Sequence, residues 1–215
     1  MNPLQAISLI EDFNPKQRLI NNKSQGSIKQ TVTQPNILKL LDEDKKQPFA
    51  NEVICYIEQV CPDEEIAFSS VGHPLLLLSK NQLSWKKPGF QIDAITKLPL
   101  DNWHSSWFII ATEGSEPIFI NIDDKDNLSP VYSAMKTEAG WDVAQISDSI
   151  GQFLLCIAAI NHALNFPEIA EPLDEAFNLN DNVAKWFFPL IKLHANNHYD
   201  EWAAVFENFL DDFSK

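Results

Sequence analysis

The sequence predicts an α+β protein, with a central antiparallel or mixed sheet of about five to six strands covered by helices and a helical C-terminal extension. Three observations predict this class. Short segments rich in branched and aromatic residues follow one another between turn residues, apolar residues at helical spacing precede them, and helical spacing returns after them. Strands gathered in one stretch and flanked by helices are typical of α+β domains.

The first part of the chain predicts one helix and a run of strands. Val53, Ile57 and Val60 share a helical face over residues 52–60, and a Cys-Pro pair ends the run. Five strand segments follow, each bounded by Pro, Gly, Asn or Asp: 75–79, 90–94, 107–112, 117–122 and 131–135. The loop 113–116 has a suitable length for a hairpin between the third and the fourth.

After Trp141 the spacing of apolar residues is helical. Ser149 and Gln152 have the spacing of a capping box, which predicts a helix start followed by one apolar stripe. Two further helices follow, and the last, over residues 199–213, predicts either completion of the core or a homodimer interface. We therefore expect an α+β domain over residues 1–165, including an N-terminal helical segment, and an acidic helical extension over residues 166–215 packed on the same domain.

The charge of the chain excludes several kinds of partner. The 215 residues carry a formal net charge of −14, and Arg18 is the single arginine. Binding nucleic acid or an anionic membrane surface requires clustered basic residues, so neither is expected. Residues 166–215 alone hold ten acidic and three basic side chains. An acidic surface of this kind favours either solubility alone or recognition of a basic protein partner.

The cysteines and the N-terminal residues predict a cytoplasmic protein. Three cysteines without a CxxC pair are not typical of a secreted disulfide framework. The first residues lack the basic start and the long apolar run of a signal peptide, and no apolar run is long enough to span a bilayer.

Signatures of catalysis are missing from the sequence, so we predict no enzyme, no catalytic residue, no metal and no cofactor. The chain has no glycine-rich phosphate loop and no nucleophile elbow. His194 and His198 have the spacing of two metal ligands on one helical face, but surface or capping roles are the favoured interpretation. The acidic run 123–127 lacks the glycine and the glutamate of a calcium loop and predicts a solvated turn.

Residues 85–154 contain an ordered series of pieces with a family pattern. The pieces are a Trp and an apolar strand (107–111), an acidic-Pro-apolar strand (116–122), Pro-Val-Tyr (130–132), Gly-Trp (140–141) and Ile-x-x-Ser-hydrophobic-x-x-Phe (146–153). This series resembles the SUKH superfamily of bacterial immunity proteins and fungal cell-wall-synthesis regulators. The chain departs from the pattern at Glu116 and Asn121, where Asp is usual, and at Lys136-Thr137, where His-Gly is usual. Roles that depend on those polar groups are therefore not carried over.

The resemblance implies an α+β fold without a catalytic centre, and for many members an immunity protein that neutralises a toxin, often a nuclease. We therefore expect a non-enzymatic binding protein whose partner is a basic protein such as a toxin. Acidic loops around aromatic groups form the expected partner-binding surface: Glu113, Glu116, Asp123, Asp124, Asp126, Tyr132 and Trp141. The alternatives are a regulatory or scaffold module that docks through the acidic C-terminal helices, and a metal-dependent enzyme that uses His194 and His198.

Overall fold

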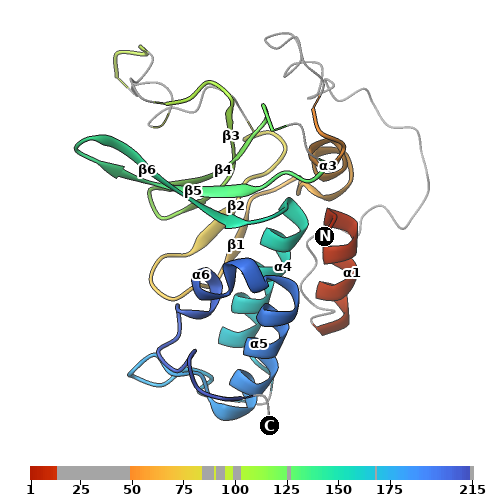
Figure 1. The fold of residues 1–215 in the computed structure, drawn as a ribbon, viewed down its shortest axis with the longest axis vertical. Helices are drawn as coiled ribbons and strands as arrows, with labels where there is room; N and C mark the ends of the chain where they lie inside the picture. The colour runs from red at the N-terminus through yellow and green to blue at the C-terminus, as the bar shows by residue number, and fades with distance from the viewer. Residues whose placement is uncertain are drawn as a thin grey trace.

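The fold is a six-stranded antiparallel sheet with helices on one side, seen in a computed structural model (Figure 1). The structure describes residues 1–13, 49–83, 90, 95–98, 103–124, 127–167 and 169–213. The strands lie in chain order: β1 (Ile66–Phe68), β2 (Leu75–Leu77), β3 (Trp107–Glu113), β4 (Glu116–Asn121), β5 (Val131–Thr137) and β6 (Gly140–Ser147). The predicted α+β class is confirmed, with an antiparallel sheet.

The helices are of uneven length. They are α1 (Pro3–Phe13), α3 (Asn51–Cys55) continued by the π-helical turn η2 (Tyr56–Val60), α4 (Ile150–Leu164), α5 (Asp181–His194), the 3₁₀ turn η3 (Asn196–His198) and α6 (Tyr199–Ala203). Within the described residues no helix has both the length and the apolar character needed to cross a membrane.

The observed strands differ from the predicted ones at three places. The segment 90–94 lies outside the described residues except for Phe90. Strand β1 was not predicted, and β6 occupies residues for which the sequence predicted the helical spacing to begin, so that prediction is wrong. The physical reason lies in the position of β6 at the edge of the sheet, where residues 142–145 are all exposed. The middle of this strand therefore shows no alternation of buried and exposed residues that the sequence could reveal, and pairing with β5 holds the strand in place.

Helix α4 is the centre of the core. The predicted cap is confirmed, because Ser149 Oγ accepts a hydrogen bond from the Gln152 backbone N–H at 3.0 Å. The prediction of a single apolar stripe is wrong, since α4 is buried on nearly all sides. The sheet covers one side of α4, while α1 and α5 pack against its other sides (Figure 1).

The prediction of a helix over residues 199–213 is wrong beyond its first turn. Helix α6 ends at Ala203, and the chain continues in turns. The side chain of Asn208 accepts from the Leu179 backbone N–H and donates to its carbonyl, and the Glu207 N–H donates to the Phe177 carbonyl. These bonds to residues 177–179 replace helical ones. As a result Phe206 is fully buried, whereas Leu210 is 81% exposed.

The two faces of the sheet have different surroundings. Successive residues of a strand point to opposite faces, so Ile118 and Ile120 of β4 point toward α4 while Phe119 points away from it. Phe119 pairs in register with Tyr132 of β5 and with Ile109 of β3. The face opposite α4 is therefore the one on which aromatic side chains gather.

Candidate functional site

A cluster of aromatic side chains covers the face of the sheet opposite α4, and we call it the aromatic face. Its members come from four adjacent strands, β3 to β6, and from the segment that precedes β3: Phe90, Trp103, Trp107, Phe119, Tyr132 and Trp141. Alternation along β3, β4 and β5 places Trp107, Phe119 and Tyr132 side by side.

The rings of the aromatic face pack on one another in two ways. Phe119 stacks between Trp107, at a centroid distance of 4.6 Å, and Tyr132, at 5.7 Å. Trp103 meets Trp107 edge-on at 5.1 Å and Trp141 at 5.4 Å. Phe119 is fully buried, whereas the other members are half-buried. The cluster thus has a buried centre and a rim of aromatic groups that reach solvent, which is the composition of many protein-binding surfaces.

One carboxylate is tied to the aromatic face by hydrogen bonds. The Tyr132 hydroxyl donates to Asp124 Oδ2 at 3.4 Å, and the Asn121 amide donates to Asp124 Oδ1 at 3.0 Å. Burial raises the pKa of Tyr132, and the negative charge of Asp124 raises that pKa further. Tyr132 therefore keeps its proton and its role as donor at neutral pH, and Asp124 is held at the border of the aromatic face.

The structure separates the predicted partner-binding residues into two groups. Asp124, Tyr132 and Trp141 belong to the aromatic face or touch it, and Asp123 lies exposed in the turn beside Asp124. Asp126 lies outside the described residues. Glu113 and Glu116 pair across the β3–β4 hairpin, at the opposite end of β4. The six residues of β4 span about 17 Å, so these two carboxylates are not part of the same site.

Four members of the aromatic face were not predicted as site residues. Phe90, Trp103, Trp107 and Phe119 fit apolar sequence patterns, which normally indicate core packing. For Phe119 the sequence does contain an indication of its position. Phe119 alternates with Ile118 and Ile120, so its aromatic ring and the two aliphatic side chains must lie on opposite faces of the strand.

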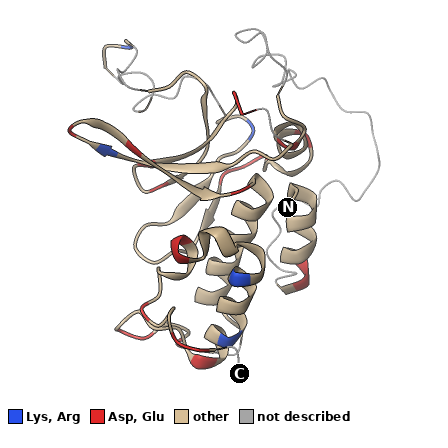
Figure 2. Ribbon diagram, in the orientation of Figure 1, with Lys and Arg blue, Asp and Glu red and all other residues tan. Residues whose placement is uncertain are grey.

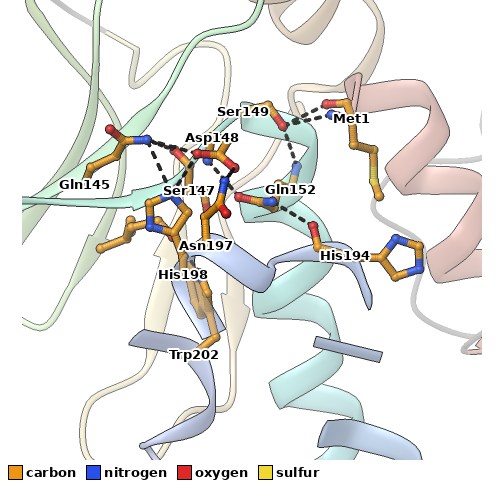
Figure 3. A network of polar contacts seen from close by, with 11 residues as sticks. Met1, Gln145, Ser147, Asp148, Ser149, Gln152, His194, Asn197, His198 and Trp202 are labelled. Atoms are coloured by element: carbon orange, nitrogen blue, oxygen red, sulfur yellow. Dashed lines mark hydrogen bonds and ion pairs between the residues drawn. The ribbon is translucent and has the colours of Figure 1, made fainter. Parts of the chain in front are cut away.

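A second polar cluster joins the C-terminal helices to the sheet (Figure 3). His198 Nε2 lies 2.9 Å from Asp148 Oδ1, and the Asn197 side chain donates to Asp148 Oδ2 at 3.1 Å. The Trp202 indole N–H donates to the Ile146 carbonyl at 2.7 Å. These contacts fix η3 and α6 against the end of β6, which is a structural role.

The two histidines with metal-ligand spacing do not share a helical face. His194 is the last residue of α5 and His198 ends η3. Figure 3 shows the His194 ring pointing away from His198, while the His194 carbonyl accepts a hydrogen bond from Gln152. Among the described residues no three His, Cys, Asp or Glu side chains are grouped so that they could hold a metal ion. The geometry on which the metal-enzyme hypothesis depended is therefore not found.

Comparison with known proteins adds no assignment, because no family model, curated protein or solved structure matches the chain.

Proposed function

We propose that this chain is a non-enzymatic binding protein, specifically an immunity protein of the SUKH type that sequesters a basic toxin such as a nuclease. The observation that carries the proposal is the half-buried aromatic face with Asp124 hydrogen-bonded at its border. The resemblance of residues 85–154 to the SUKH pattern supports the same function.

The charge distribution supports a basic partner. Acidic residues occur on both the sheet and the helical part of the ribbon, and basic residues are fewer (Figure 2). A net charge of −14 accelerates the approach of a basic protein at low salt. Such long-range attraction mainly raises the association rate, whereas buried aromatic contacts mainly slow dissociation. The aromatic face and the acidic surface therefore supply different parts of the proposed recognition.

The proposal is tested with the products of toxin-like genes adjacent to the gene for this chain. We expect one of them to bind at low salt and to lose its toxic activity when the two proteins are co-expressed. Inhibition by binding should saturate at one copy of this chain per toxin, whereas an enzyme that inactivates the toxin would act below that ratio. Failure of every candidate to bind at low salt would contradict the immunity function.

The contact surface is tested with one matched pair of variants. Trp141→Ala removes a half-buried ring of the aromatic face, and we expect the dissociation rate of the complex to rise by about tenfold or more. Leu193→Ala removes an apolar side chain that is 75% exposed on α5, and it should leave binding unchanged. Equal effects of the two variants would show that the aromatic face is not the contact.

A second candidate function is a regulatory or scaffold module that docks through its C-terminal part. A groove beside α5 favours it, because Leu193 and Leu210 lie there highly exposed next to Asp211. Deleting residues 166–215 would not test this function, since Phe187 and Phe206 are fully buried core residues. The double variant Leu193→Ala, Leu210→Ala is the suitable test. Loss of partner binding in this variant, with normal binding by Trp141→Ala, would favour the scaffold function.

A further inference from the structure

A cavity of about 160 Å³ lies on the other face of the sheet, between the strands, α4 and α6. Its apolar walls come from the strands, from α4 and from α6: Phe68, Leu75, Ile118, Ile146, Ile157, Ile160 and Trp202. An engineered apolar cavity of about 150 Å³ holds one benzene molecule. The space is thus large enough for an organic group of the size of one ring.

Carboxylates from opposite sides line the same cavity. Glu113 comes from the end of β3 and is half-buried, and Glu201 comes from α6 and is exposed, so it lies at the mouth. Ser70 and Ser133 add hydroxyl groups. No Lys, Arg or His side chain is among the described residues that line the cavity. An apolar space that carries two acidic groups and no basic one is complementary to an organic cation.

The environment of Glu113 supports this complementarity. Burial raises the pKa of Glu113, and the nearby charge of Glu116 raises it further, while a hydrogen bond with the Ser70 side chain lowers it. His73 also lowers the pKa, but it lies beside the hairpin turn at Gly114 and does not line the cavity. A cation inside the cavity would offset the cost of keeping this carboxylate charged.

We propose that this cavity binds a small primary amine with an apolar body of about the size of one ring, its ammonium group toward Glu113 and Glu201 and its apolar body against the isoleucines. The proposal is independent of the immunity function, because the cavity and the aromatic face lie on opposite faces of the sheet. The site is formed only when the C-terminal helical part is folded on the sheet, since Glu201 and Trp202 belong to α6.

Benzylammonium is the probe, and benzyl alcohol is its uncharged counterpart of the same shape. A ligand with so few non-hydrogen atoms is expected to bind with a Kd of about 1 mM. Binding is followed in spectra of the isoleucine methyl groups of the full chain. We expect saturable shifts of Ile118, Ile146 and Ile157, and a Kd about tenfold weaker for benzyl alcohol because the charged hydrogen bond is lost.

Two variants and one control test the residues. Glu113→Gln keeps the shape of the side chain and should weaken benzylammonium binding by about tenfold. Glu116→Gln removes the same charge from the same hairpin but outside the cavity, and it should change the Kd by less than about twofold. Ser133→Leu places apolar volume in the cavity and should abolish binding of both probes; if it does not fold, the comparison of the two glutamate variants decides alone.

Three results would overturn the proposal. They are equal affinity for benzylammonium and benzyl alcohol, equal weakening by Glu113→Gln and Glu116→Gln, and shifts that appear away from the isoleucines of the cavity. Absence of saturable binding at about 10 mM benzylammonium, well above the expected Kd, would overturn it as well.

Discussion

Replacing Glu52 by Ala should cost about 3 kcal/mol of the free energy of unfolding, because this side chain joins three parts of the core. The residue is only 4% exposed. Its two carboxylate oxygens accept hydrogen bonds from the Ser129 N–H at 2.6 Å and from the Gly151 N–H at 3.2 Å. Each buried donor left unpaired costs about 1–3 kcal/mol. Removing a buried carboxylate also removes its own desolvation cost, so the net loss lies near the lower half of the summed range.

Urea unfolding of matched variants measures this loss. Glu58→Ala is the control, since Glu58 is exposed on the adjoining η2 turn and should change stability by less than about 0.5 kcal/mol. Glu52→Gln keeps one acceptor oxygen and should lose about half as much as Glu52→Ala. A loss below about 1 kcal/mol for Glu52→Ala would refute the assignment of Glu52 as the acceptor for both N–H groups.

The pH dependence of the same variants tests the burial argument. Desolvation raises the pKa of Glu52 above its ordinary value of 4.5, despite the opposing backbone hydrogen bonds. A raised pKa means that the folded state holds this proton more tightly than the unfolded chain does. The stabilising contribution is therefore fully present below pH 4.5 and declines as the pH rises through the folded-state pKa. The stability advantage of the wild type over Glu52→Gln should therefore shrink as the pH rises above 4.5; an advantage that grows with pH would contradict the burial argument.

Substitutions at three further positions test the packing around α4. Ser149→Ala should cost about 1 kcal/mol or more in urea unfolding, because it removes the helix cap and the hydroxyl that donates to the Met1 carbonyl at 2.8 Å. Ser149→Thr, which keeps both the acceptor and the donor, should restore most of it. Gly151→Ala should cost more than Ser149→Ala, because a Cβ there would lie 2.5 Å from two carbonyl oxygens of residues 1 and 2; a smaller cost would show that α1 moves aside without penalty. Burial lowers the pKa of His162 from 6.5, so its stabilising contribution is present above pH 6.5 and is lost as the pH falls. His162→Leu should flatten the acid side of the thermal stability profile, and an unchanged profile would contradict this.

The sequence predicted those parts of the fold that short-range signals determine. The hairpin at 113–116 is confirmed, with Glu113 opposite Glu116 in register, and so is the cap at Ser149. Each depends on residues close together in the chain, so the local pattern was sufficient. Strand β6 and the turns after Ala203 depend on partners far along the chain, which are β5 for the strand and residues 177–179 for the turns. No local spacing contains that information.

The candidate site could be predicted only in part for the same reason. The sequence singled out Asp124, Tyr132 and Trp141 by residue type, but their association depends on the registers between β4 and β5 and between β5 and β6. The β4–β5 register places Phe119 beside Tyr132 and so creates the aromatic face. The same alternation sends Ile118 and Ser133 into the cavity on the other face. Without knowledge of this strand pairing, the acidic residues at the two ends of β4 could not be assigned to two separate sites.

Separating the two ends of β4 changes how the net charge of the chain should be understood. The carboxylate oxygens of Asp124 accept hydrogen bonds from Tyr132 and Asn121, so this residue orders the aromatic face more than it attracts a distant cation. Glu113 is half-buried beside an apolar cavity, where its charge is costly and a bound cation would be favourable. Long-range steering must then come from exposed carboxylates such as Asp123, which salt screens within about 8–10 Å. Because these roles depend on burial and on partners, equal charges at neighbouring positions of one sequence do not contribute equally to recognition.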